Sequence, residues 1–367
     1  MTITSSLSIV VIGFGLIGPR HAQAVDECPQ THLAALVDPF KTHEKRHTAR
    51  TMFPSVPHFR TLEGLLASGI HIDGAIVCTP NHTHLHVAQV LAKHNIAMLI
   101  EKPISPDVED AVKIKRLSED TGIPMIIGHH RRFNPYVLAT RDHLHRCGKI
   151  IAVDAVWCLQ KCESYFKQTP WRCSKKMGGG VINLNLVHDL DLLQYLLGPI
   201  KCVYATECEK TRDDNTGEDA VVEGAVLTLT FQSGTRGSFI VCDNVISPAN
   251  FEMGTGENPL IEKNSQGIDG VFYRFFGTRG TLSVPDLTLF HQDGSKETGW
   301  WSPMHKESID ADVEGVPFAL QVEHFAKVMK GEEEPRCTPD DGIRAMLAID
   351  AVVKSLETDM PVKVAAI

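Results

Sequence analysis

Lys102 is the side chain of this sequence best placed for acid–base chemistry. It follows an apolar run, residues 96–100, that is typical of a buried parallel strand, and it stands between Glu101 and Pro103. The carboxyl ends of parallel strands form the edge at which open α/β sheets bind their ligands. Pro103 disfavours a helical backbone at Lys102, so an extended, constrained chain should hold the lysine. The alternative is an ordinary surface lysine beside a proline turn.

A glycine-rich turn earlier in the chain indicates what such an edge would bind. Residues 7–12 predict a strand, a helix should begin near Pro19, and Gly13-Phe14-Gly15-Leu16-Ile17-Gly18 lies between them. This is the GxGxxG pattern in its strand, turn and helix context. The glycines permit a tight turn, close approach of a pyrophosphate and close packing of the helix, whose N-terminus favours phosphate. All six residues are predicted to bind a dinucleotide; the alternative for a lone pattern is a plain glycine turn.

Asp38 supports the dinucleotide interpretation. It ends the next predicted strand, residues 33–37, about twenty residues after the last glycine, where an acid binds the ribose hydroxyls of NAD. A carboxylate there would repel the 2′-phosphate of NADP, and no arginine follows it directly. Lys41 and Lys45 leave some tolerance for that phosphate. We therefore expect NAD in preference to NADP.

The rest of the first third alternates between predicted strands and helices. Strands at residues 74–78, 96–100 and 125–128 alternate with helices at 62–67, 84–93 and 107–120. This alternation predicts a doubly wound parallel sheet, hence a Rossmann domain over residues 1–128. Residues after the strand ends are further candidates for cofactor binding: Thr79, Pro80, Asn81, His84, Glu101 and Lys102. Glu101 would either fix the strand end or bind a cofactor hydroxyl.

The remaining chain has a different pattern. After a predicted helix at 135–147, apolar β-rich runs occur at 149–160, 201–209, 221–231, 235–243, 270–276 and 281–284. Only one predicted helix, residues 185–197, interrupts them, so we expect an α+β domain with a mostly antiparallel sheet over residues 129–367. Two helices, 317–330 and 339–357, close the chain and could pack back on the first domain. Residues 249–266 and 292–312 are predicted loops.

Composition narrows the class of protein. The 367 residues exceed one ordinary core, and 43% hydrophobic with 22% charged residues is typical of a soluble globular protein. A formal charge of −9 without a basic stripe argues against nucleic-acid and membrane partners. Ten cysteines without CxxC pairs and the lack of a secretory leader predict a cytoplasmic protein. His82, His84 and His86 lack supporting carboxylates or cysteines, so no metal site is predicted.

The motifs together resemble those of the glucose-fructose oxidoreductase, inositol dehydrogenase and MocA family. The resemblance implies a Rossmann domain, an open-faced antiparallel sheet, and hydride transfer between a nicotinamide and a hydroxyl of a sugar, polyol or cyclitol. It also implies that Lys102 is the catalytic lysine, that the bond to Pro103 is often cis, and that His188 is the active-site histidine. The matching motifs lie in the first two hundred residues: Gly13 to Gly18, Thr79-Pro80-Asn81, Glu101-Lys102-Pro103, Trp171-Arg172, Gly178-Gly179-Gly180 and His188-Asp189-Leu190-Asp191.

The chemistry of alcohol oxidation agrees with that implication. A hydride leaves carbon and a proton leaves oxygen, so an acid/base group is required beside the nicotinamide. A lysine can serve if burial and the nicotinamide cation lower its pKa towards neutrality. We expect Lys102 to be that group, and His188 to orient the hydroxyl or take over the proton.

This sequence departs from the family pattern near His188. Many members carry an aspartate four residues before the histidine, where this chain has Leu184. Asn185 lies three residues before His188 and could bind a substrate hydroxyl, but it cannot act as a base. The alternative is that Asn185 is a helix N-cap. Asp189 and Asp191 are interpreted as acids that complement the helix dipole.

Two further groups are candidates for substrate binding. His130 and Arg131, with Arg132, follow the strand at 125–128 and could bind nicotinamide, phosphate or substrate; salt bridges at a domain hinge are the alternative. Trp171 and Arg172 precede the glycine run, and in relatives this pair approaches the cofactor or substrate. Their alternative is a packed aromatic beside a surface arginine.

Three functions remain open from the sequence. The first is an NAD-dependent dehydrogenase of a polyhydroxylated small molecule, which the open sheet face would assemble into a homodimer or homotetramer. The second is an NAD-dependent glycosidase of the same superfold, although its histidine-containing glycine motif is not visible near Gly178. The third is a nucleotide-sensing regulator, against which Lys102 and His188 count.

Overall fold

The computed structural model of the chain describes residues 6–265 and 267–367. The chain forms two compact units, each built from two segments. Residues 1–133 and 315–346 contribute to the first unit, and residues 134–314 and 347–367 to the second. The limits 1–128 for a nucleotide-binding domain and 129–367 for a substrate-binding and oligomerisation domain stay a prediction.

The first unit contains a six-stranded parallel sheet in the order β3-β2-β1-β4-β5-β6. This is the Rossmann order, in which the direction of strand addition reverses between β1 and β4 and creates a ligand crevice at the carboxyl ends. Both faces are covered, because Ile9 and Val11 are as deeply buried as Val10 and Ile12. The strands are β1 (Leu7–Ile12), β2 (Thr31–Val37), β3 (His58–Phe59), β4 (Gly74–Val77), β5 (Ala97–Glu101) and β6 (Met125–Gly128).

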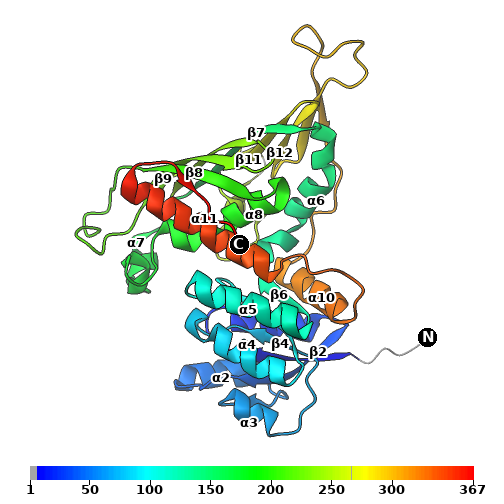
Figure 1. Cartoon of the computed structure of the whole chain (residues 1–367), viewed down its shortest axis with the longest axis vertical. Helices are drawn as coiled ribbons and strands as arrows, with labels where there is room; N and C mark the ends of the chain where they lie inside the picture. The colour runs from blue at the N-terminus through cyan, green and yellow to red at the C-terminus, as the bar shows by residue number, and fades with distance from the viewer. Residues whose placement is uncertain (1–5, 266) are drawn as a thin grey trace. The chain divides into compact units, whose positions relative to one another are not determined.

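Helices flank this sheet, as Figure 1 shows for α4 and α5. The helices of the unit are α1 (Gly18–Glu27), α2 (His43–Met52), α3 (Leu62–Leu66), α4 (His84–Lys93), α5 (Val108–Thr121) and α10 (Pro317–Met329). Helix α10 lies late in the sequence and packs on α1. Its residues Phe318 and Phe325 join the hydrophobic core around Ile9. Helix α2 was not predicted, because only Ala49 of its ten residues is buried and its sequence has no apolar face.

The second unit contains a nine-stranded sheet in the order β14-β13-β12-β11-β7-β10-β9-β8-β15. All neighbours are antiparallel except β10 and β7, which run parallel. The strands are β7 (Ile150–Cys158), β8 (Ile200–Glu207), β9 (Gly224–Phe231), β10 (Arg236–Cys242), β11 (Tyr273–Gly277), β12 (Gly280–Val284), β13 (Thr288–His291), β14 (His305–Ser308) and β15 (Val362–Lys363). The predicted fold class, a Rossmann domain with an α+β second half, is confirmed.

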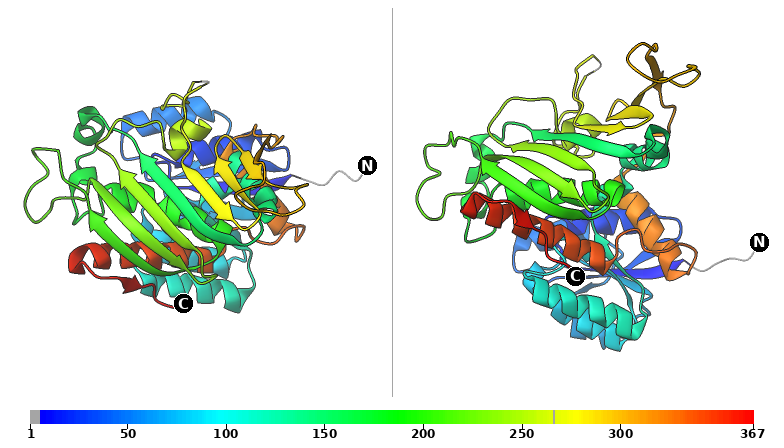
Figure 2. Two further views of the ribbon diagram at one scale, coloured as in Figure 1. Left: turned by 90° about the horizontal axis from the view of Figure 1, so that it is seen from above. Right: turned by 45° about the horizontal axis from the view of Figure 1, so that its top comes forward.

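Only one face of this second sheet is covered. Side chains of α6 (Pro135–His143), α8 (Val187–Leu197) and α11 (Pro339–Thr358) pack on alternate strand residues such as Leu227 and Phe239. The intervening residues, such as Thr228 and Ile240, face solvent. Figure 2 looks onto this open face on its left, with α11 behind the strands. The period-two pattern of the sequence therefore fixes which face is open.

Some predicted elements are wrong in detail. Both predicted loops contain regular structure: α9 (Phe251–Thr255) lies in the first and β14 in the second, while Gln266 lies outside the described residues. The helix predicted at 135–147 ends at His143 and continues as a 3-10 turn, Leu144–Cys147. Among the described residues, no helix has the length and apolar character needed to cross a membrane.

Candidate functional site

The glycine turn has the geometry that its sequence predicts. Gly13 has φ +98°, and a Cβ there would lie 2.5 Å from the Cys78 carbonyl oxygen. A Cβ on Gly18 would collide with the Gly13 carbonyl oxygen, which explains the close contact between helix and turn. A Cβ on Gly15 would meet nothing within 4 Å, so the space in front of the second glycine is open. A phosphate group could approach the backbone there.

The start of α1 also fits a phosphate. Its N-cap, Ile17, provides no side-chain hydrogen bond, and its first turn contains no acidic residue. Pro19 has no backbone N–H and Arg20 donates its own to the Ile17 carbonyl oxygen, so the Gly18 N–H and the positive end of the helix dipole are what this helix start offers an anion. Phe14 is buried against Phe40 and Phe53, whereas Leu16 is 85% exposed. These features together fit the pyrophosphate of a dinucleotide.

Asp38 connects the glycine turn to the loop after β2. Its Oδ2 accepts a hydrogen bond from the Phe14 backbone N–H at 2.9 Å, and its Oδ1 accepts one from Phe40 at 2.7 Å. Each carboxylate oxygen retains a second lone pair, so ribose hydroxyls could still donate to it. Asp38 therefore shapes the turn in addition to its predicted contact with ribose.

The loop after β4 is held by side-chain hydrogen bonds. Thr83 donates from its hydroxyl to Thr79 at 2.7 Å, within the 3-10 turn Asn81–Thr83 that follows Pro80. The His84 ring is buried, with Nε2 2.8 Å from the Thr79 carbonyl oxygen and Nδ1 3.2 Å from that of Ile104. Burial lowers the pKa of His84. A neutral imidazole has one N–H, so it donates to one of these two carbonyl oxygens, and the Thr79 oxygen is the closer of the two.

Both carboxylate oxygens of Glu101 form hydrogen bonds at the end of β5. Its Oε1 lies 2.7 Å from Nε2 of His21 on α1, and its Oε2 accepts the Lys102 backbone N–H at 3.0 Å. A Cβ on Gly128 would lie 2.9 Å from the same carboxylate, so β6 leaves room for it. Burial opposes ionisation, but the hydrogen bond and charge of His21 outweigh it and keep the pKa of Glu101 low. Sequence reasoning did not single out His21.

Lys102 follows Glu101 in the sequence and is partly buried. Burial lowers the pKa of its ammonium and Arg131 contributes in the same direction, while Glu101 opposes both. The bond to Pro103 is cis, as the family resemblance implied. In residues 6–265 and 267–367, the Lys102 ammonium has no hydrogen-bond acceptor.

The residues after β6 divide into two groups. Arg132 donates to the Arg336 carbonyl oxygen at 2.8 Å and pairs with Asp341 at 3.3 Å, so the salt-bridge interpretation applies to it. His130 stacks on Phe318 with ring centroids 4.5 Å apart. His130 and Arg131 both lie in the 3-10 turn His130–Phe133, at the carboxyl edge of the parallel sheet.

In the second unit, His188 lies in the first turn of α8 and is 7% exposed. A π-helical turn, Ile182–Leu186, precedes this helix and contains Asn185. The N-cap interpretation of Asn185 is wrong, because the helical backbone begins before it and its side chain makes no capping bond. Such π turns occur often at functional sites. Asp189 accepts a hydrogen bond from the Tyr273 hydroxyl at 2.5 Å within the core, which agrees with a structural role.

Lys161 is the principal residue that sequence reasoning missed. Its side chain is only 7% exposed, and its Nζ donates to Asn185 Oδ1 at 2.7 Å and to Asp243 Oδ2 at 3.3 Å. It also lies over the rings of Trp157 and Tyr165. Burial lowers the pKa of Lys161, and Asp243 opposes that shift. No local pattern predicts the two hydrogen bonds of this lysine, because Asn185 and Asp243 are 24 and 82 residues away in the sequence.

Trp171 and Arg172 lie beside the glycine run. Trp171 is 39% exposed, and the Arg172 guanidinium stacks 3.8 Å from the Tyr165 ring centre. The Gly180 N–H donates to the Arg172 carbonyl oxygen at 2.9 Å. A Cβ on Gly179 would collide with this segment, so that glycine is needed for the close approach. The pair is thus anchored by packing, with the indole left accessible.

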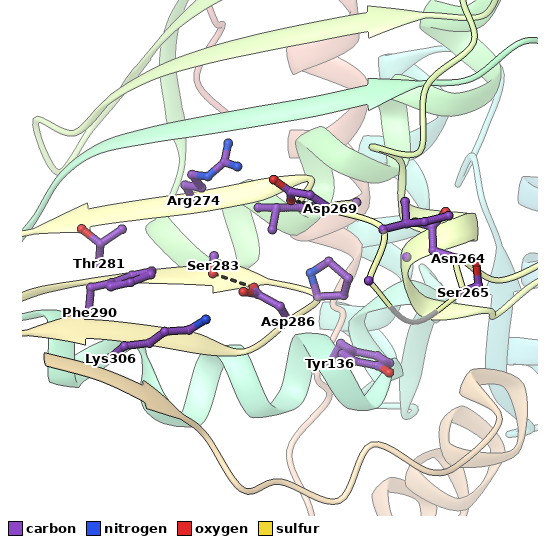
Figure 3. A pocket seen from close by; sticks show the side chains of 16 residues that line it. Tyr136, Asn264, Ser265, Asp269, Arg274, Thr281, Ser283, Asp286, Phe290 and Lys306 are labelled. Atoms are coloured by element: carbon purple, nitrogen blue, oxygen red, sulfur yellow. Dashed lines mark hydrogen bonds between the residues drawn. The ribbon is translucent and has the colours of Figure 1, made fainter.

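Two cavities of the second unit are lined by described residues. One, of about 730 Å³, is lined by Lys161, Phe166, Lys167 and Arg212 among others. The other, of about 570 Å³, lies against the open sheet face; Figure 3 shows Arg274 and Thr281 on its strands. Among the described residues that line these two cavities, none is a predicted site residue. In the described part of the chain, no group of three or more His, Cys, Asp or Glu side chains is arranged to hold a metal ion.

Comparisons with known proteins agree with this description. Residues 7–129 match the family model described as an oxidoreductase family with an NAD-binding Rossmann fold. Residues 145–364 match the model of the C-terminal alpha/beta domain of the same oxidoreductase family.

Relatives align over nearly the whole chain at low identity. The inositol 2-dehydrogenase of Rhizobium meliloti is 23% identical over 360 residues, covering 97% of this chain and 98% of that protein. The myo-inositol 2-dehydrogenase of Thermotoga maritima is 23% identical over 368 residues, covering 97% and 98%. The crystal structure of the WlbA dehydrogenase from Bordetella pertussis, in complex with NADH and UDP-GlcNAcA, shares the fold with a TM-score of 0.72 at 18% identity, covering 99% and 100%.

Proposed function

The chain belongs to the glucose-fructose oxidoreductase, inositol dehydrogenase and MocA family, and from this premise we propose that it oxidises a secondary hydroxyl of a sugar, polyol or cyclitol. The observation that supports this most is the Lys102 ammonium at the carboxyl edge of the Rossmann sheet. Its pKa is lowered by burial, and no described residue accepts a hydrogen bond from it. Inositol dehydrogenases among the relatives suggest the substrate class.

Each proposed site residue has a separate role in the oxidation of the hydroxyl. Bound NAD would supply the hydride acceptor. Lys102 in its neutral form accepts the hydroxyl proton, and general-base help of this kind contributes about 10²–10⁴ in rate. His188 orients the hydroxyl, and Glu101 holds the strand end from which Lys102 projects. Asn185, His130, Arg131, Trp171 and Arg172 are the proposed substrate contacts.

For the cofactor we propose NAD in preference to NADP. The Asp38 carboxylate is fixed by two backbone N–H groups, so it stays in place and would repel a 2′-phosphate. The glycine turn and the open start of α1 are the proposed pyrophosphate site. Thr79, Pro80 and Asn81 are the proposed contacts on the neighbouring strand end, and His84 supports them through its bond to the Thr79 carbonyl.

We also propose a homodimer or homotetramer formed through the open sheet face. Exposed apolar side chains on that face include Val226, Ile240 and Phe276, which a second copy would cover. A cytoplasmic location remains part of the proposal, supported by ten cysteines that all stay free.

The test is net NADH formation by the purified chain on a panel of sugars, sugar lactones and inositols, with NAD and with NADP. We expect net reduction of NAD by at least one member, and weaker reduction of NADP. Turnover that recycles the cofactor without net NADH would favour the glycosidase. Nucleotide binding without any turnover would favour the regulator.

A further inference from the structure

Lys161 is a buried charge that the proposed mechanism does not use. Its shortest contact is to the neutral amide of Asn185, at 2.7 Å, while the Asp243 carboxylate lies farther away at 3.3 Å. Asp243 has a closer cationic partner, since Arg212 donates to its other oxygen at 2.7 Å. Arg212 also pairs with Glu223 at 3.4 Å. The geometry of Lys161 is therefore directed at Asn185.

Lys161 determines the orientation of the Asn185 side-chain amide. An ammonium has three donors and no acceptor, so it can bind only the amide oxygen. The Nδ2 group of Asn185 must then face away from Lys161, and no described residue accepts a hydrogen bond from it. Asn185 is only half-buried. Its two N–H donors are thus presented to a ligand.

The charge on Lys161 also makes Asn185 a stronger donor. A hydrogen bond to the amide oxygen polarises the amide, and such coupling is larger in a buried environment. Hydrogen bonds to a charged acceptor are roughly twice as strong as those between neutral groups. A carboxylate oxygen is therefore the acceptor that gains most from this arrangement.

We propose that Lys161 is a positioning residue that locks Asn185 as a hydrogen-bond donor, and that the site thereby selects a sugar acid over the corresponding neutral sugar. The inference rests on the proposed function. Its basis is the contact of Lys161 with Asn185, one helical turn before His188.

The experiment compares kcat/KM for matched pairs, glucuronate against glucose and galacturonate against galactose, with NAD as cofactor. We expect the unmodified chain to prefer the acid of at least one pair by roughly tenfold or more. Lys161→Met allows the Asn185 side-chain amide to rotate between its two orientations. The ratio of kcat/KM for the acid to that for the neutral sugar should then fall towards one, mainly through KM. Asn185→Asp has the same shape but only accepts, so the preference should reverse.

Two variants separate positioning from a structural role. Lys161→Arg keeps a donor for Asn185 Oδ1 and should restore most of the preference. Lys167→Met is the matched control, because Lys167 lies six residues later in the sequence, its side chain is 70% exposed, and its ion pair among the described residues is with Glu163. It should leave the preference and the unfolding midpoint unchanged. If Lys161→Met lowers the unfolding midpoint without changing the preference, the inference is wrong.

The remaining outcomes distinguish this inference from the proposed function. Equal or better use of the neutral sugars by the unmodified chain overturns the selection of acids and leaves the dehydrogenase standing. Turnover of inositols without turnover of glucuronate or galacturonate would likewise overturn the selection of acids and leave the dehydrogenase function standing. The absence of net NADH with every compound overturns both.

Discussion

Lys102 in the first unit and Lys161 in the second are both withdrawn from water, but their ammonium groups meet different neighbours. Burial lowers the pKa of each lysine. The Lys161 ammonium donates to Asn185 and Asp243, whereas no described residue accepts a hydrogen bond from that of Lys102. An ammonium tied to fixed acceptors orients them, and one without acceptors can exchange its proton. We therefore propose orientation as the role of the lysine in the second unit and proton transfer as the role of the lysine in the first.

The strongest way to break this comparison is to replace each lysine by methionine. Lys102→Met should lower turnover by about 10²–10⁴ because the base is lost. It should change the free energy of unfolding by about 1 kcal/mol or less, since no partner is left unpaired. Lys161→Met should instead lower the free energy of unfolding by about 1–3 kcal/mol, because the buried Asp243 and the half-buried Asn185 each lose a donor. Steady-state kinetics and urea unfolding measure the two effects.

NAD binding is the control for this pair. Neither substitution touches the glycine turn, so the Kd for NADH, measured by fluorescence, should stay within about threefold. If Lys102→Met were to unfold the protein while Lys161→Met abolished turnover, the two assignments would have to be exchanged.

The charge network behind Lys161 predicts an acid-sensitive second unit. Burial opposes ionisation of Glu223, but bonds from the Thr211 backbone, Asn215 and Asn244 and the charge of Arg212 lower its pKa to about 2. Because its pKa is lower in the folded than in the unfolded chain, Glu223 contributes stability above about pH 4.5, which is lost as the pH falls towards 2.

Glu223→Gln tests this expectation. At neutral pH the variant should be less stable by about 1–3 kcal/mol, since the buried donors lose a charged acceptor. Its free energy of unfolding should then fall less steeply than that of the unmodified chain between pH 4.5 and pH 2. Urea unfolding across that range measures the difference, and parallel curves for the two proteins would contradict the account.

The smallest expected effect concerns the charge beside Lys102. Glu101 raises the pKa of Lys102, so Glu101→Gln should lower that pKa further. Oxidation needs neutral Lys102 and should speed up as the pH rises through its pKa. The rising limb of kcat/KM against pH should therefore lie below the ordinary lysine range, and move to lower pH in the variant. A rising limb that moves to higher pH in Glu101→Gln would contradict the statement that Glu101 raises the pKa of Lys102.

Much of the first unit could be predicted from the sequence, because its signals are local. The glycine turn, Asp38 and the strand before Lys102 lie in short patterns whose spacing dictates their geometry. The hydrophobic runs of 7–12 and 125–128 likewise match observed strands. The regular alternation of strand and helix was sufficient for the class of fold.

Other features depended on contacts between distant residues. Lys161 meets Asn185 and Asp243, which are 24 and 82 residues away, so its burial has no local signature. The π turn at Asn185 extends the helix before the predicted start, and a helical periodicity cannot reveal it. The short edge strand β14 is stabilised by pairing with β13 and lies in a sequence rich in polar residues.

The central claim, that the Lys102 amine moves the substrate proton, can be tested by chemical rescue. Lys102→Ala leaves room for a small amine in place of the side chain. We predict that methylamine restores part of the lost turnover of this variant, in proportion to its unprotonated fraction, and has no such effect on the unmodified chain. Turnover of Lys102→Ala at the rate of the unmodified chain, without added amine, would contradict the claim.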